Sequence, residues 1–318
     1  MAAMLNPIPA PGGAGGVTFQ KATAEDRYQA LALLLTGRWG TQEPVVDHFL
    51  TFAGGQDLAL DQIWTARQGD RAVAAAMVVP CAGRTGIAFT CPVQDRRHAE
   101  VCGQLVDHAC AGQDAQRVRL VQALVDPHLT LQAWVFESAG FMPLATLMYM
   151  EGRAVPGKGS LDLGPDLQVV AWEDRRREQF AQAILASYEE TLDCPKLRGL
   201  RHIEDIIDGH RATGQFEAPL WHLVLLEERP AGVMLLNELP QQQALELVYL
   251  GLAPACRGRG VGTKLVRHGL TLAARRGCRA VLCAVDAANR PALALYERVG
   301  FRTTGRKLAL IRCLPPGV

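Results

Sequence analysis

The stretch Glu246–Gly262, ELVYLGLAPACRGRGVG, joins a β-rich segment to a glycine-rich turn. Gly258, Gly260 and Gly262 stand at alternate positions, and a residue without a Cβ lets a ligand come close to the backbone. A helix is predicted over Thr263–Arg276, and its free amides and positive dipole end point back toward the turn. Because the turn also carries two arginines, the sequence predicts a site for an anionic group, most simply a phosphate.

Two common phosphate-binding motifs do not fit this turn. A dinucleotide fingerprint that starts at Gly258 requires glycine at position 263, where the chain has Thr263. A P-loop requires Gly-Lys-Ser/Thr in succession, whereas Gly262 is followed by Thr263 and Lys264. A tight turn without a ligand is the alternative that this stretch by itself leaves open.

The segments around the turn predict strands that alternate with helices. Gly277 is expected to end the first helix in the left-handed conformation, and a short helix is expected to start at Asn289-Arg290-Pro291 and to stop at Gly300. The expected strands are Trp221–Glu227, Ala231–Leu236, Ala244–Leu252, Ala280–Val285 and Lys307–Cys313. This order predicts an α/β (α+β) fold, a mixed sheet flanked by helices.

The chain contains two segments that repeat at one offset. When the second half is moved back by 160 positions, Val281–Asp286 aligns with Val121–Asp126 and Tyr296–Phe301 aligns with Phe136–Phe141. Two matching hexamers at the same offset indicate a duplication, so we expect two tandem copies of one unit. The expected domains are a flexible tail (1–16), a first unit (17–151), a glycine- and proline-rich linker (152–166) and a second unit (167–318).

Composition excludes several classes of protein. The 318 residues are 49% hydrophobic and 20% charged, with a net charge of +1, which argues against disorder and against general binding of nucleic acids. No apolar run reaches the ~18 residues of a membrane helix, and the first residues lack the pattern of a signal peptide. The nine cysteines and eight histidines form no metal-binding spacing. We therefore expect a cytoplasmic protein without a metal, and the oligomeric state stays open.

The glycine-rich turn and the short helix together resemble the signatures of the GNAT superfamily of acyl-CoA-dependent N-acyltransferases. The first signature, Gln/Arg-x-x-Gly-x-Gly/Ala, is present as Arg257, Gly260 and Gly262 after the strand ELVYLGLAP. The second is present as Asn289 followed by Tyr296–Phe301, YERVGF. The resemblance covers roughly residues 169–313, and it implies tandem GNAT-like domains of which the C-terminal one is active.

The resemblance also implies a co-substrate, acetyl-CoA, and residues that hold it. The amides of the turn would bind pyrophosphate, backbone groups of the preceding strand would pair with pantetheine, and Asn289 would contact the coenzyme further along. The expected coenzyme-binding residues are Leu250, Leu252, Arg257, Gly258, Arg259, Gly260, Val261, Gly262, Thr263 and Asn289.

Acyl transfer to an amine requires a base for the ammonium and an acid for the leaving thiolate. Tyr296 is the expected general acid, because the family places a tyrosine beside the sulfur; the alternative is a core residue. Glu246 is the expected base, eleven residues before Arg257; the alternative is a solvated strand glutamate.

The first copy lacks these features. At the same offset, Arg97–Cys102 replaces the glycine-rich turn, Glu100 would face the phosphates, and Phe136 replaces Tyr296. This copy is therefore expected to be degenerate. The acceptor is expected to contact Ser187–Trp221, whose acidic residues could attract a cationic amine. The acidic residues and histidines considered in this segment are Glu189, Glu190, Asp193, His202, Glu204, Asp205 and His210.

The resemblance favours an N-acetyltransferase that acts on a primary amine of a small molecule or a peptide, without nucleic-acid or membrane partners. An acetyltransferase similar to mycothiol synthase, which also pairs a degenerate with an active unit, is an alternative for the substrate. A non-catalytic module that binds coenzyme A is an alternative from a different class of function.

Overall fold

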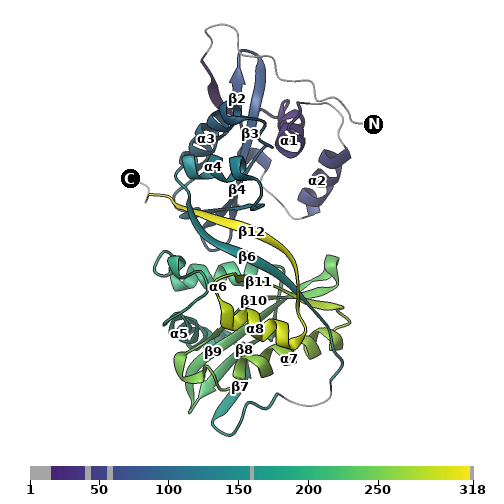
Figure 1. Ribbon diagram of the computed structural model, residues 1–318, viewed down its shortest axis with the longest axis vertical. Helices are drawn as coiled ribbons and strands as arrows, with labels where there is room; N and C mark the ends of the chain where they lie inside the picture. The colour runs from purple at the N-terminus through teal and green to yellow at the C-terminus, as the bar shows by residue number, and fades with distance from the viewer. Residues whose placement is uncertain (1–15, 40–43, 56–59, 158–160, 316–318) are drawn as a thin grey trace.

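A computed structural model describes residues 16–39, 44–55, 60–157 and 161–315, so the expected tail lies almost entirely outside the described residues. The first half alternates strands with helices, as predicted (Figure 1). Its elements are β1 (Thr18–Lys21), α1 (Arg27–Thr36), α2 (Pro44–Gly55), β2 (Ile63–Gln68), β3 (Arg71–Cys81), β4 (Thr85–Thr90), α3 (Arg96–Ala111), β5 (Leu120–Val125), α4 (Thr130–Ser138) and β6 (Met142–Arg153).

The second half follows the same order of elements. They are β7 (Leu167–Ala171), α5 (Arg177–Ser187), α6 (Ile203–Ala212), β8 (Gln215–Leu226), β9 (Arg229–Leu239), β10 (Ala244–Leu252), α7 (Val261–Arg275), β11 (Ala280–Asp286), α8 (Arg290–Val299) and β12 (Arg302–Cys313). Strand β10 has the predicted bounds, whereas β12 begins before the predicted Lys307. Gly277 and Gly300 both have positive φ, +73° and +98°, as expected at helix ends.

The described strands form one sheet of twelve strands, in the order β1-β2-β3-β4-β5-β12-β6-β11-β10-β9-β8-β7. The pairs β4–β5 and β10–β11 are parallel and the other pairs are antiparallel, so the predicted mixed sheet is confirmed. The halves exchange their last strands: β12 pairs with β5, and β6 pairs with β11. Figure 1 shows β6 and β12 side by side where they pass between the two units.

Helices cover both faces of the sheet in each half. In the first half α3 and α4 pack on one face and α1 and α2 on the other, and in the second half α7 and α8 lie opposite α5 and α6. The exchanged strands carry core residues with them. Leu310 is fully buried in the core of the first half, and Met150, 1% exposed, is buried in that of the second. Each core is therefore completed by the other half of the chain.

The segment predicted as a linker runs along the second half. The Ala154 amide donates to the Arg279 carbonyl (2.9 Å), and Leu163 is buried in the core formed with α7 and α8. The domain boundaries themselves remain a prediction. Within the described residues, no helix combines the length and apolar character needed to cross a membrane.

The duplication is visible in the structure, with one shift. β5 and β11, and α4 and α8, correspond at the predicted offset of 160, but α3 begins at Arg96 and α7 at Val261. The reason is a shorter connection in the first half, residues 91–95, than in the second, residues 253–260. Arg97–Cys102 therefore lies inside α3, and a gap-free comparison of this stretch with the glycine-rich turn does not hold.

Candidate active site

The parallel strands β10 and β11 diverge in the second half. Their pairing covers Ala244 to Glu246 only, and from Leu247 to Leu252 β10 pairs with β9 on its other side. This edge of β10 therefore has no strand partner on the β11 side, and Leu250 and Leu252 lie on it. Unpaired amides and carbonyls on a strand edge can pair with an extended chain that carries amide groups.

A cavity of ≈ 80 Å³ lies between the diverging strands. Its walls include Leu250 of β10, Asn289 at the start of α8 and Tyr296 of α8, three residues that the sequence predicted as parts of one site. Asp193 also lines it, from the connection between α5 and α6. Glu246 and Leu252 are not among the cavity-lining residues.

The three glycines of the turn have two different roles. Gly258 and Gly260 have φ of +71° and +78°, and no atom lies within 4 Å of where a Cβ would stand, so the backbone conformation is what requires glycine. At Gly262 a Cβ would lie 2.9 Å from Leu295 Cδ1, so this glycine lets α7 approach α8. No side chain caps α7 at Gly260, which leaves the first amides of the helix available to an anion.

Both arginines of the turn have partners in the protein. The Arg257 guanidinium donates to the carbonyls of Ser187 (3.0 Å) and Glu189 (2.6 Å), so it holds the end of α5 against the turn. Arg259 pairs with Asp166 at 2.5 Å, and its guanidinium lowers the pKa of that carboxyl. The predicted contacts of both arginines with phosphate remain predictions.

Tyr296 is buried, 7% exposed, with its ring 5.3 Å from that of Phe301. Burial, together with nearby Cys283 and Asp193, raises its pKa well above the usual value of a phenol, so the hydroxyl keeps its proton at neutral pH. In the described part of the chain this hydroxyl has no hydrogen-bond partner. A buried phenol without a partner is available to a ligand as a donor.

Glu246 lies on β10 between Asn237 of β9 and Leu282 of β11. Burial raises its pKa. The pKa of the Tyr149 phenol, on β6, is raised by burial and by the nearby carboxylate of Glu246. Because β6 comes from the first half, sequence reasoning missed Tyr149: only the exchange of strands brings it here.

Asp193, one of the acidic residues expected to attract the acceptor, lies beside the end of β11. Its Oδ1 accepts from the Asp286 amide (3.1 Å), and Asp286 Oδ2 accepts from the Cys194 amide (3.2 Å), so the two residues join the α5–α6 connection to the end of β11. Burial raises the pKa of Asp193. Asn289 caps α8 through its Oδ1, which accepts from the Ala292 amide (3.3 Å).

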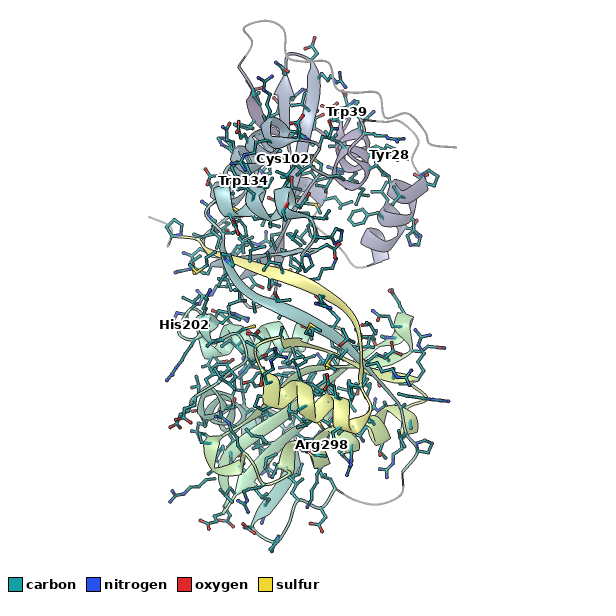
Figure 2. The ribbon with its side chains drawn as sticks, in the orientation of Figure 1. Tyr28, Trp39, Cys102, Trp134, His202 and Arg298 are labelled. Carbon is teal, nitrogen blue, oxygen red and sulfur yellow. The ribbon has the colours of Figure 1, made fainter. Side chains whose placement is uncertain are left out.

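Three acidic residues of the expected acceptor segment, all on α6, form ion pairs within the protein. Glu204 and Asp208 both pair with Arg177, and Asp205 pairs at 2.8 Å with Arg84, which lies between β3 and β4 of the first half. His202, at the start of α6 and labelled in Figure 2, lines a small cavity together with Arg84 and Arg119 of the first half. The first half thus contacts the segment that is expected to recognise the acceptor.

The first half retains a cavity at the equivalent place. It has ≈ 480 Å³, lies where β4 and β5 diverge after Ile87, and is lined by Phe136 in the position of Tyr296. Asp95, however, caps α3 by accepting from the His98 amide (2.8 Å), and Gln132 donates to the Thr90 carbonyl at the end of β4 (3.3 Å). The Leu252 carbonyl at the end of β10 likewise accepts from Arg257 Nε (3.0 Å), so the capped helix N-terminus is the clearer difference between the two halves.

The sequence predicted no metal-binding cluster, yet the fold brings Cys91, His98 and Cys102 together, with Cys102 labelled in Figure 2. The two thiols are 3.8 Å apart. Both ring nitrogens of His98 are in use: Nδ1 accepts from the Gln94 amide (3.2 Å), so Nε2 carries the proton toward the Val73 carbonyl (3.1 Å). We assign these contacts to hydrogen bonding and not to a metal.

Comparisons with known proteins point to one family. The model of the acetyltransferase (GNAT) family matches residues 177–301. A peptidyl-lysine N-acetyltransferase (YjaB) of Salmonella typhimurium is 36% identical over 90 residues, 28% of this chain and 54% of that protein. A mycothiol acetyltransferase of Corynebacterium glutamicum is 48% identical over 56 residues, 18% and 19% of the two chains. The matches therefore span about half of the first relative and a fifth of the second.

Among solved structures, a GCN5-related N-acetyltransferase from Sphaerobacter thermophilus has the same fold over nearly the whole chain. The TM-score is 0.60, the identity is 18%, and the match covers 95% of this chain and 97% of that one. The similarity extends through both halves of the chain.

Proposed function

We propose that this chain, whose residues 177–301 match the acetyltransferase (GNAT) family, transfers the acetyl group of acetyl-CoA to a primary amine. One observation carries the proposal: the uncapped N-terminus of α7, the unpaired edge of β10 and the free hydroxyl of Tyr296 surround the same divergence of two strands. The phosphates of the coenzyme would bind at the N-terminus of α7, its amide groups would pair with the edge of β10, and its thiolate would lie beside Tyr296.

The residues of the second half fit the coenzyme. The open space around Gly258 and Gly260 admits a pyrophosphate to the amides of residues 260–263, and Leu250 and Leu252 offer backbone groups to pantetheine. The remaining contacts would come from Arg257, Arg259 and Asn289. Binding by Arg259 has to displace its ion pair with Asp166, or share it.

The chain's own residues would move two protons. Acetyl-CoA, when bound, supplies the thioester carbonyl. Glu246, as the base, would take a proton from the acceptor ammonium, and its raised pKa helps because a more basic carboxylate accepts a proton more readily. As the nitrogen–carbon bond forms and the carbon–sulfur bond breaks, Tyr296 would give its proton to the thiolate, and its phenolate would regain the proton that the attacking nitrogen loses as it becomes an amide.

Two acceptor classes follow from the names of the relatives. The Salmonella protein is a peptidyl-lysine N-acetyltransferase, which favours a peptide amine, and the Corynebacterium protein is a mycothiol acetyltransferase, which favours a small molecule. Both matches lie over part of the chain only. We propose a primary amine as the shared chemistry, with a mycothiol-type acceptor as the second candidate.

Turnover of acetyl-CoA with a panel of amines tests the function. The panel includes a lysine peptide, a polyamine and glucosamine, and release of free coenzyme A is measured together with the mass of the product. We expect one class of amine to be acetylated. Calorimetric binding of acetyl-CoA without any acetylated product would instead support the non-catalytic binding module, and absence of both would contradict the proposal.

A further inference from the structure

Two carboxylates are buried together at the end of β11. Asp286 is 5% exposed, and Asp193 is half-buried against it, with its Oδ1 3.1 Å from the Asp286 amide. Among the described residues, no Lys, Arg or His forms a salt bridge with either. Burying a carboxylate without a positive partner is costly, so a cationic ligand would stabilise this pair.

The two carboxylates are not equivalent. Both oxygens of Asp286 accept backbone amides, Oδ2 from Cys194 (3.2 Å) and Oδ1 from Ala288 (2.8 Å). Asp193 accepts the Asp286 amide and a contact from the Asn289 side chain. A carboxylate has about four acceptor positions, so Asp193 keeps capacity for a further donor.

An independent observation lies in the same cavity. Tyr296 is 7% exposed as a residue, and in the described part of the chain its hydroxyl has no hydrogen-bond partner. Asp193 and Tyr296 line the one cavity of ≈ 80 Å³.

The neighbouring acidic residues show why Asp193 is different. Asp205, Glu204 and Asp208 stand on α6, and arginines pair with all three. Their negative charge is compensated within the protein. Asp193 combines two properties that these residues do not share: a position in the cavity with Tyr296 and, among the described residues, no salt bridge.

We propose that Asp193 binds the ammonium group of the acceptor, so that the site selects primary alkylammonium compounds over neutral alcohols of the same shape. The inference rests on the proposed function and deepens it. An N–H donor with a positive charge forms a shorter and stronger bond to a carboxylate than a hydroxyl does. Asp193 is then the residue that recognises the acceptor, and Glu246 remains the candidate that takes its proton.

The test uses the full chain loaded with coenzyme A, which carries no acetyl group and therefore allows no turnover. n-Butylammonium and 1-butanol are titrated in turn, and binding is followed by ligand-observed nuclear magnetic resonance. We expect the wild type to bind the ammonium at least about tenfold more tightly than the alcohol, equivalent to ~1.4 kcal/mol. Asp193→Asn keeps an oxygen for the Asp286 amide and should reduce the preference to within about twofold.

Two further variants control the result. Asp208→Asn removes an acidic residue of the same segment that already pairs with Arg177, and it should keep the wild-type preference. Asp193→Glu keeps the charge and should retain the preference with weaker affinity. If Asp193→Asn unfolds, Asp193→Ala and Asp193→Glu are compared instead, after circular dichroism has shown that each is folded. The proposal then predicts that Asp193→Ala loses the preference for the ammonium and that Asp193→Glu keeps it.

The inference is overturned if the wild type binds both probes alike, or if folded Asp193→Asn keeps its preference for the ammonium. Affinity for coenzyme A is measured separately by calorimetry. If the wild type does not bind coenzyme A, the proposed function fails, and the same titrations without coenzyme A still decide whether Asp193 holds an ammonium.

Discussion

At the scale of single residues, Tyr296 has two roles: its ring packs in the core, and its hydroxyl is the proposed general acid. Its ring packs with Phe301 in the core formed with α7 and α8, while its hydroxyl stays without a partner. The first half carries Phe136 at the equivalent position, with its ring 5.3 Å from Phe141. The same packing thus exists without the hydroxyl, so the core does not require a tyrosine here.

We therefore expect Tyr296→Phe to fold normally and to bind acetyl-CoA with wild-type affinity. Because general acid catalysis contributes about 10²–10⁴-fold, kcat should fall by at least an order of magnitude. Single-turnover acetyl transfer measures the chemical step even if product release limits the steady state. Transfer within twofold of wild type would show that Tyr296 is only a core residue.

Buried histidines make the fold sensitive to acid. Burial, with nearby His268, lowers the pKa of His222 to about 4, and His210 is lowered to about 4 by burial and Arg201. In the unfolded chain both groups return to about 6.5. Since the unfolded state then binds the proton first, the stability from these neutral histidines is complete above pH 6.5 and is lost as the pH falls toward 4.

Chemical denaturation at pH 7, 5.5 and 4.5 checks this expectation. The free energy of unfolding should fall across the series, by about 1.4 kcal/mol for each pKa unit that a buried histidine is shifted. His222→Gln cannot gain the proton, so its curve should be flatter than that of the wild type. Parallel curves for the two proteins would contradict the assignment to His222.

At the scale of elements, the helices α3 and α7 occupy equivalent places and end differently at their N-termini. Asp95 caps α3 with its own carboxylate, whereas Gly260 leaves α7 uncapped. A carboxylate side chain that caps a helix accepts hydrogen bonds from the same backbone amides that a phosphate would otherwise bind. This contrast supports the proposal that only the second half binds acetyl-CoA.

We expect Gly260→Glu to abolish acetyl-CoA binding, because it adds bulk and negative charge where the pyrophosphate is proposed to lie. Gly277→Glu is the matched control. Gly277 has φ of +73°, like the +78° of Gly260, and equally open surroundings, but it follows the opposite end of α7. Both variants should lose similar stability, and calorimetry should find binding retained in Gly277→Glu alone. Unchanged affinity in Gly260→Glu would refute the site.

At the scale of the whole molecule, the exchange of β6 and β12 makes the halves interdependent. Each strand lies between strands of both halves, and each carries buried residues into the other core. Arg84 of the first half also holds α6 through Asp205. We infer that the degenerate half is retained because it completes the sheet and braces the acceptor segment.

Thermal unfolding of the full chain should accordingly show one cooperative transition. Residues 167–318 expressed alone lack β6, so β11 and β12 lose a shared neighbour, and we expect this fragment to aggregate or to remain partly unfolded. Co-expression with residues 1–166 should restore a folded complex. A fragment that folds alone and acetylates its acceptor with wild-type kinetics would contradict the interdependence.

The sequence by itself determined the local features of this protein. It indicated the glycine-rich turn, the cap at Asn289 and the helix end at Gly300, because backbone conformation and capping depend on a few adjacent residues. It also revealed the duplication and the α/β class, because strands and helices have different hydrophobic periods. The coenzyme-binding and catalytic roles of the named residues remain predictions.

Only the tertiary structure decided with which half of the chain each last strand pairs. The duplication gives both halves a similar final strand, so local pattern cannot tell whether β12 pairs within its own half or with β5. That choice depends on hydrogen bonds and core contacts between residues far apart in the chain. The same reason explains why Tyr149 was missed, and why the sequence could not distinguish Asp193 from the other acidic residues of its segment: Glu246 and Asp286, their respective partners, become neighbours only after the sheet has formed.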